Sequence, residues 1–190
     1  MTAPRIGPGG RAEVGLITWT LSAVAGRLTG TQPPNLFLTF GRHRSLFRGW
    51  LRFAGRLMPG GKLPRRETEL VILRVAHLAR CEYEFEHHVR LGARAGVTPA
   101  DVERVVEGPE APGWSPREQL MLDAVDALHR DRDLDERTWI ALRTHLDERE
   151  LIELILLAGH YEMLATFVNT LRIPTDRPRG HRARGVPAGG

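Results

Sequence analysis

The spacing of apolar residues limits what this chain can fold into more than any other feature. From residue 35 onward they recur every three or four positions, and those that share one helical face are Leu36, Phe40, Phe47, Trp50, Leu51, Ala54 and Leu57. This spacing matches the 3.6-residue turn of an α-helix, whereas a half-buried strand alternates every second residue. No segment has a strand pattern and no internal repeat is present, so the sequence predicts an all-α fold.

Start and stop signals divide the chain into several helices. A helix is expected over 14–28, another from 35 to the Pro-Gly-Gly at 59–61, and a third from Pro64 towards Cys81. A further run from Cys81 ends at Gly96, and no proline or glycine marks a break between these two runs. Capping residues open later helices at Thr98 and Ser115, and a last helix is expected to end near residue 171.

The length of 190 residues fits one domain. We expect a flexible N-terminus over residues 1–12 and a single compact helical domain over 13–174. Residues 175–190 are rich in arginine, glycine and proline and are predicted to form a disordered basic tail.

The formal net charge of +4 raises the question of nucleic-acid binding. Residues 173–190 hold four arginines and one aspartate, so +3 of that charge lies in the tail and the body carries about +1. A near-neutral body with a short basic tail does not predict a nucleic-acid partner.

Compartment and membrane signals point to a soluble cytoplasmic protein. The N-terminus lacks the apolar core of a signal peptide, and no apolar run reaches the roughly 18 residues of a membrane span. Cys81 is the only cysteine, so the chain forms no internal disulfide, which fits a reducing compartment.

Three side chains with complementary chemistry follow one another at helical spacing. Cys81, Glu84 and His88 stand at i, i+3 and i+7, within about 60° of arc and about 10 Å of helix axis. They can converge on one small substrate, and each can shift the pKa of the others. The same spacing also fits a small core cysteine beside an ordinary Glu–His helix pair, and spacing alone leaves that alternative open.

Other polar residues give weaker signals. His77, His160 and Tyr161 are candidate pocket-lining residues, whereas Tyr83 and His87 are expected to face away from Cys81, Glu84 and His88. A metal site that includes His77 is disfavoured, because His77 and His88 would lie about 16 Å apart on a continuous helix and ligand distances are about 2 Å. We therefore predict no metal site.

Two segments carry a resemblance to a known family. The first segment is residues 69–98, which include Glu69 and the motif Cys81-x-x-Glu84-x-x-x-His88. It resembles the core of the carboxymuconolactone decarboxylase / alkyl hydroperoxidase D family. The second segment, residues 159–174, resembles the C-terminal part of the same family. The similarity extends from about residue 35 to 174. It implies an all-helical, cofactor-free enzyme of the alkyl hydroperoxidase D-like type that assembles as a homo-oligomer, a trimer or hexamer.

The resemblance mixes two branches of that family. Glu69, Cys81 and His88 match the glutamate, first cysteine and histidine of the alkyl hydroperoxidase D motif, but Glu84 stands where that branch has a second cysteine. A sulfenate on Cys81 would therefore need an outside thiol. An acid followed four residues later by histidine, as in Glu84 and His88, resembles the decarboxylase branch.

Three functions follow, in order of preference. The first is a lyase acting on a small carboxylated or carbonyl compound, in which His88 donates a proton, Glu84 orients His88 and Glu69 relays protons or anchors the helices. The second is a thiol peroxidase, with peroxiredoxin activity at Cys81 and an external reductant. The third is a non-catalytic helical assembly module.

The helix over 151–171 is apolar on nearly all sides, which predicts that a neighbouring subunit covers part of it.

Overall fold

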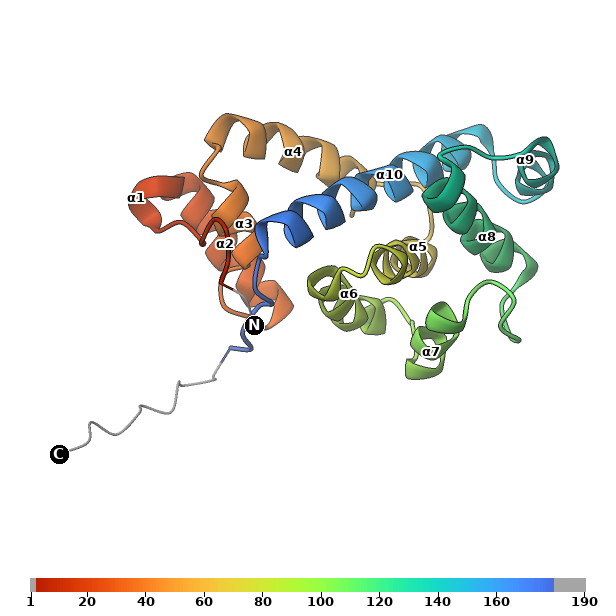
Figure 1. Cartoon of the computed structure of the whole chain (residues 1–190), viewed down its shortest axis with the longest axis horizontal. Coiled ribbons are helices and arrows are strands. Elements are labelled where there is room, and N and C mark those ends of the chain that lie inside the picture. The colour runs from red at the N-terminus through yellow and green to blue at the C-terminus, as the bar shows by residue number, and fades with distance from the viewer. Residues whose placement is uncertain (1–2, 180–190) are drawn as a thin grey trace.

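The computed structural model describes residues 3–179, which form ten α-helices and no strand (Figure 1). The helices are α1 (Arg11–Val14), α2 (Leu16–Thr29), α3 (Asn35–Phe40), α4 (Arg44–Leu57), α5 (Arg65–Leu78), α6 (Glu82–Arg94), α7 (Pro99–Glu107), α8 (Pro116–Asp131), α9 (Glu136–Arg143) and α10 (Glu148–Leu171). An isolated bridge between Thr31 and Pro178 is the one β-type pairing within this range. The all-α fold class predicted from the sequence is confirmed.

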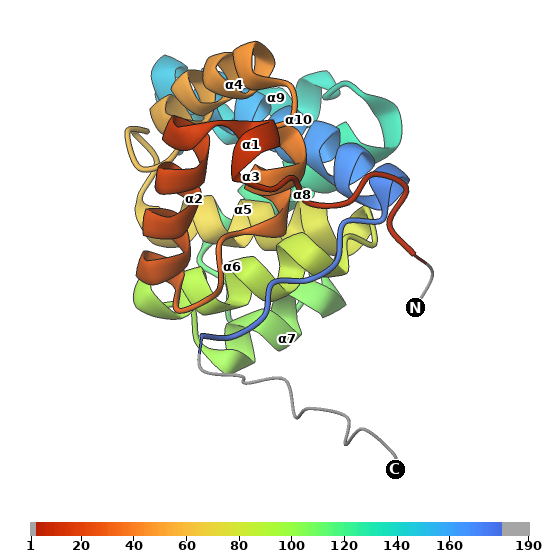
Figure 2. The ribbon, with the colours of Figure 1, turned by 90° about the vertical axis from the view of Figure 1, so that its left-hand side faces the viewer.

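Helix α5 forms the centre of the fold and packs against α6, α7, α8 and α10 (Figures 1 and 2). Its residues from Thr68 to Ala76 are all buried, including Glu69 and Arg74. A helix that is buried on every side needs neighbours on every side. The site residue Glu69 therefore sits in the most enclosed element of the molecule.

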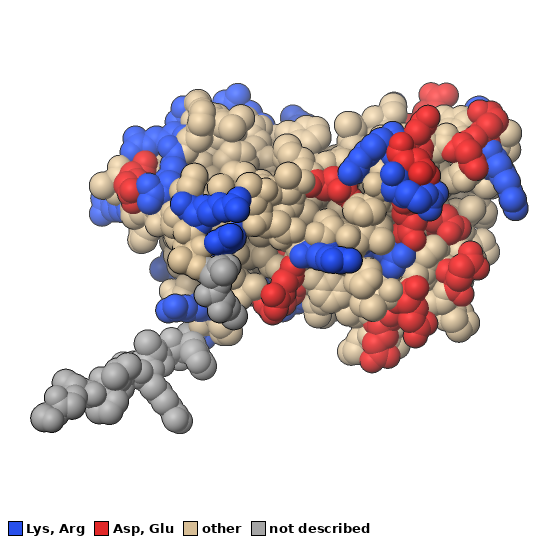
Figure 3. Space-filling view, viewed as in Figure 1, with Lys and Arg blue, Asp and Glu red and all other residues tan. Residues whose placement is uncertain are grey.

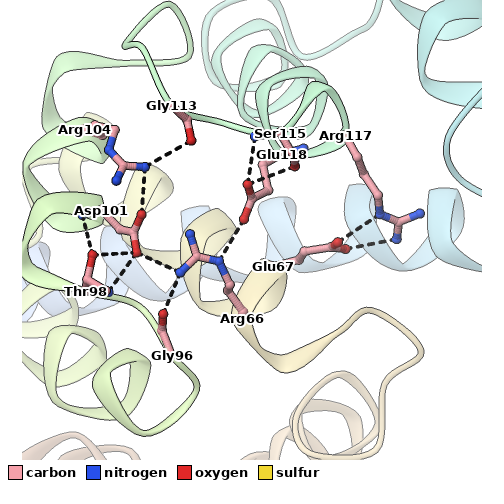
Figure 4. A network of polar contacts seen from close by, with 10 residues as sticks. All are labelled: Arg66, Glu67, Gly96, Thr98, Asp101, Arg104, Gly113, Ser115, Arg117 and Glu118. Atoms are coloured by element: carbon pink, nitrogen blue, oxygen red, sulfur yellow. Dashed lines mark hydrogen bonds and ion pairs between the residues drawn. The ribbon is translucent and has the colours of Figure 1, made fainter.

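Ion pairs fix the polar end of α5 to the helices around it (Figure 4). The Arg66 guanidinium lies between Asp101 of α7, at 2.7 Å, and Glu118 of α8, at 2.8 Å. Hydrogen bonds from Arg66 hold the pKa of the Asp101 carboxyl well below its usual range. Arg117 of α8 donates to Glu67 of α5 at 2.9 Å. These contacts join α5, α7 and α8 at the end where α5 begins.

The chain breaks between α5 and α6, a point that the sequence left open. Helix α5 ends at Leu78, Arg80 has a left-handed backbone with φ 51°, and Cys81 becomes the N-cap of α6 rather than a helical residue. The Cys81 N–H donates to the Ala76 carbonyl at 2.8 Å, which closes the turn. Glycine is the usual residue in this conformation, so its absence hid the break.

The N-terminal helices depart from expectation in detail. The single helix expected over 14–28 is interrupted at Gly15, whose φ of 82° suits glycine alone, so that α1 and α2 form separate helices. Helices α1 to α4 lie together at one end of the molecule, α7 to α9 lie at the other, and α10 runs between them (Figure 1).

Both terminal segments hydrogen-bond to the helical body. Arg5 N–H donates to the Leu171 carbonyl at 2.9 Å and Gly9 N–H to the Leu38 carbonyl at 3.1 Å, within the segment expected to be flexible. Near the other terminus, Arg179 N–H donates to the Gly30 carbonyl at 2.9 Å. Figure 2 shows this C-terminal segment running past α6. Of the tail predicted over 175–190, residues 180–190 lie outside the described residues.

Helix α10 is long and apolar enough to cross a membrane by length and composition. More than half of its apolar window is buried inside the fold, as expected for the core helix of a soluble protein. The remaining side is exposed along a stripe that consists of Ile152, Ile155, Leu156 and Met163. One chain therefore does not bury this helix on all sides.

Candidate functional site

Glu69 and His88 meet between α5 and α6. The His88 Nδ1 atom lies 2.7 Å from the Glu69 Oε2 atom, and both side chains are almost completely buried. Arg65, one turn earlier on α5, pairs with the other Glu69 oxygen at 2.6 Å. The hypothesis that Glu84 orients His88 is therefore wrong in this structure, because Glu69 from the neighbouring helix occupies that position.

The Glu69 contact settles which nitrogen of His88 is available for chemistry. A carboxylate accepts hydrogen bonds, so Nδ1 carries a proton and donates it to Glu69. Nε2, on the other side of the ring, remains for a ligand. His88 lines a partly open cavity, where this nitrogen can act.

Glu84 is buried in α6 and lines the same cavity. Neither of its carboxyl oxygens has a hydrogen-bond partner among the described residues. Burial raises the pKa of Glu84 to about 8, the nearby Cys81 thiol opposes this shift, and the negative charge of Glu162 adds to it. Glu84 is consequently a neutral acid at pH 7, able to donate a proton or a hydrogen bond.

Cys81 is 1% exposed and does not line the cavity. Burial, followed by the negative charge of Glu84, raises the pKa of the Cys81 thiol to about 12, although backbone N–H groups at the start of α6 oppose this. The residue is therefore a thiol at neutral pH, whereas the thiolate is the reactive nucleophile.

The cavity measures about 320 Å³, at the small end of the range for ligand sites. Its titratable lining comes from α6 and α10, and consists of Tyr83, Glu84, His87, His88, His160 and Tyr161. Helices α2, α3 and α4 and the segments next to them supply a mostly apolar remainder, including Leu36, Phe37, Trp50, Leu51, Ala54 and Met58. A small, largely apolar ligand fits this space.

The structure also locates the other polar residues that the sequence analysis considered. His160 and Tyr161 lie at the cavity, but His77 does not, and its ring instead packs near Phe85 at 6.4 Å between centroids. The expectation that Tyr83 and His87 face away is wrong, because both line the cavity. The N-terminal helices fold over that side of α6, where Tyr83 accepts a hydrogen bond from the Leu36 N–H. Spacing within α6 could not reveal this long-range packing.

Aromatic and imidazole rings follow one another along the cavity wall. Trp50 stacks on His160 at 6.1 Å, His160 meets Tyr161 edge-on at 5.3 Å, and Tyr161 meets His88 edge-on at 5.1 Å. His87 continues the series at 5.4 Å from His88. Each ring is held by its neighbours, so the polar atoms of this wall have fixed positions.

Within residues 3–179, no group of three histidine, cysteine or acidic side chains is arranged to hold a metal ion. The groups that gather at the cavity are suited to proton transfer and hydrogen bonding.

Solved structures share this fold at low sequence identity. A peroxidase-related protein from Silicibacter sp. TM1040 superposes with a TM-score of 0.79 and 16% identity, covering 95% of this chain and 96% of that one. An alkylhydroperoxidase AhpD core protein from Ralstonia eutropha JMP134 gives 0.81 and 19%, covering 95% and 94%. The debrominase Bmp8 gives 0.74 and 16%, covering 90% and 91%. The fold is therefore that of the AhpD-like proteins.

A sequence match accompanies the likeness in fold. Residues 44–127 match the model of the carboxymuconolactone decarboxylase family, and this segment contains Glu69, Cys81, Glu84 and His88. Over this segment the chain is similar to the carboxymuconolactone decarboxylase family, and its fold is that of the AhpD-like proteins. A comparison with curated proteins found no match.

Proposed function

We propose that this protein is a cofactor-free acid–base enzyme of the lyase type that acts on a small carbonyl or carboxylated compound. The observation that carries the proposal is that the wall of one cavity holds both a neutral carboxyl group, Glu84, and a histidine, His88, that is bound by a second carboxylate. The match of residues 44–127 to the carboxymuconolactone decarboxylase family supports an enzyme but leaves the reaction open.

For a decarboxylation, the bond between the substrate carbon and its carboxylate breaks and carbon dioxide leaves. The electron pair moves into an enolate, whose oxygen accepts a hydrogen bond from Glu84. His88, as an imidazolium paired with Glu69, gives its Nε2 proton to the carbon and regains a proton from water. Acid–base catalysis of this kind contributes about 10² to 10⁴ in rate.

The size and lining of the cavity favour a ring compound of modest size. A cysteine-to-alanine variant of Bmp8 has been solved with 2,3,4-tribromopyrrole. By similarity of fold, we propose that this chain also takes a small ring in its cavity.

Carbon dioxide release from a panel of small ring keto acids and ring carboxylates tests the proposal. We expect His88→Ala to abolish release, because the variant loses the Nε2 proton that is transferred to the substrate carbon. His145→Ala is the matched control, since His145 is exposed and does not line the cavity. Equal activity of wild type and His88→Ala on the best substrate would contradict the acid–base role.

Thiol peroxidase chemistry is the second candidate, and it is supported by the match of Glu69, Cys81 and His88 to the alkyl hydroperoxidase D motif and by the likeness in fold to peroxidase-related proteins. Deprotonated Cys81 would attack a peroxide oxygen, the O–O bond would break, and the alcohol would leave with a proton. Cys81 would become a sulfenic acid that an outside thiol reduces. Cys81→Ser should abolish peroxide reduction and largely spare lyase activity. If changing Cys81, Glu84 and His88 together alters neither activity, a non-catalytic assembly role would be favoured.

We also propose that the chain forms a cytoplasmic homo-oligomer, a trimer or hexamer. Exposed apolar stripes support this, on α10 and at Ile17, Leu21, Val24 and Leu28 of α2. Light scattering on the wild type and on Leu21→Glu should show an oligomer that the variant weakens. A monomeric wild type at micromolar concentration would contradict the assembly, and cell fractionation tests the location.

A further inference from the structure

Buried polar atoms that lack a hydrogen-bond partner gather around the cavity. Six residues among 3–179 carry such atoms, and four of them line the cavity: Trp50 at Nε1, Glu84 at both carboxyl oxygens, His87 at Nδ1 and His160 at Nδ1. Of the other two, Glu69 pairs with Arg65 by charge. A buried polar atom without a partner costs about 1–3 kcal/mol, and folded proteins tolerate few of them. Their concentration at one place indicates a site built for a polar ligand.

Two of these groups lie apart from the acid–base pair. His160 of α10 is 5% exposed and stacks on Trp50 of α4, with ring planes 12° apart. The Tyr161 ring touches both His160 and His88, so it stands between them along the wall. The cavity thus has two polar regions, one at Glu84 and His88 and one at Trp50 and His160.

The charge of the second region restricts what it can bind. No lysine or arginine lines the cavity. Burial lowers the pKa of His160 to about 4, so its ring is neutral at pH 7. The Trp50 indole can only donate, whereas a neutral imidazole donates at one nitrogen and accepts at the other. An uncharged oxygen that accepts from Trp50 and exchanges a hydrogen bond with His160 satisfies both groups, and a carboxylate would be desolvated without a cation.

We propose that Trp50 and His160 form an anchoring subsite for a hydroxyl or carbonyl oxygen of a ring compound. The reacting polar group of that compound lies at Glu84 and His88, so the substrate class is a small ring with oxygen substituents at two separated positions. This inference rests on the proposed function for the identity of the reacting end. The anchor determines specificity and takes no part in proton transfer.

Calorimetric titration with hydroquinone and phenol tests the subsite, because these rings differ by one hydroxyl. Wild type should bind hydroquinone about three- to tenfold more tightly than phenol, the range expected for one net hydrogen bond. His160→Phe keeps an aromatic ring but removes both nitrogens, and should bind the two compounds equally. His145→Phe, the same change at an exposed position, should keep the wild-type preference. A wild type without preference, as for a subsite that holds only water, or a His160→Phe variant that retains the preference, would overturn the proposal.

Trp50→Phe provides a second variant in case His160→Phe folds poorly. It removes the Nε1–H donor and should also erase the preference for hydroquinone. A folded Trp50→Phe that retains the preference would count against the anchoring subsite.

His88→Ala separates this inference from the proposed function. That variant should lose activity and still bind hydroquinone more tightly than phenol. If wild type binds both compounds equally while His88→Ala loses activity, the anchoring subsite is wrong and the acid–base proposal stands. If His88→Ala keeps full activity and wild type prefers hydroquinone, the acid–base proposal is wrong and the anchoring subsite stands.

Discussion

The two ends of the molecule differ in charge and in what they bury. Residues 1–63 contain nine basic residues and one acidic residue, whereas 21 of the 23 acidic residues lie within 64–172. In Figure 3, blue side chains gather over the α1–α4 end and red ones over the α7–α9 end. The acidic part uses its charges inside the fold, in pairs such as Arg74–Asp126 at 2.6 Å. The basic part leaves most of its arginines in solvent.

Helices α2 and α5 differ in which residues they bury: α2 buries small residues, whereas α5 buries its large apolar ones. Helix α2 buries Thr18, Ser22 and Gly26 and exposes its large apolar residues. Gly26 is required there, because a Cβ atom would lie 2.5 Å from the Gln32 carbonyl oxygen. Helix α5 is buried throughout and positions Glu69. The comparison teaches that α5 and α6 position Glu69, Glu84 and His88, while the N-terminal helices supply a wall of the cavity and expose an apolar face.

The largest effect on turnover should come from a change at Glu69 of α5. Glu69→Gln keeps size and hydrogen bonding but removes the charge that supports a protonated His88, so turnover of any substrate found should fall about 100-fold. Glu67→Gln is the matched control, because Glu67 of the same helix pairs with Arg117 outside the cavity. Equal losses in the two variants would assign the effect to packing of α5.

A change in the wall should affect binding and spare chemistry. Ala54→Leu adds volume to the cavity from α4, so KM should rise about tenfold, a change of about 1.4 kcal/mol, while kcat stays within a factor of two or so. A fall in kcat with an unchanged KM would show that this wall residue affects the chemical step rather than substrate binding.

Stability should depend on pH through Glu84. Its pKa is raised to about 8 by burial, so the protonated form favours the folded state and stability is lost as pH rises towards 8. Between pH 6.5 and 8 the free energy of unfolding should fall by up to about 1.4 kcal/mol per pH unit. Urea denaturation of Glu84→Gln should show a much flatter dependence. A wild type as flat as the variant would mean that Glu84 is ionised in the folded state.

The smallest effect concerns His160. Burial lowers its pKa to about 4, so an unfolded chain gains a proton below pH 6.5 that the folded chain does not, and stability is lost as pH falls through that range. Thermal denaturation of His160→Phe should show a gain over wild type that is larger at pH 5.8 than at pH 7.5, by about 1 kcal/mol. A gain that does not change with pH would show that His160 is protonated when folded.

The sequence predicted what depends on local rules. Helical periodicity gave the all-α class, and the capping residues Thr98 and Ser115 open α7 and α8 as predicted. The sequence left the break at Arg80 open, because a left-handed arginine has no sequence signal.

The site was predicted only in part, because it depends on contacts between helices. Glu69, Glu84 and His88 were singled out from the resemblance and the spacing. The partner of His88 comes from α5, not from its own helix, and Tyr83 and His87 face the cavity because α3 folds over α6. Contacts between residues this far apart in the sequence cannot be read from spacing along one helix.

A titration of the Glu84 carboxyl tests the central claim, that the cavity holds a neutral acid beside the Glu69–His88 pair. Carbon-13 NMR of protein labelled at the glutamate side-chain carboxyl follows every such group against pH, and Glu84→Gln identifies the resonance. We predict a midpoint near pH 8, with the group protonated at pH 7. A midpoint near the ordinary value of about 4.3 would make Glu84 a carboxylate and contradict the account.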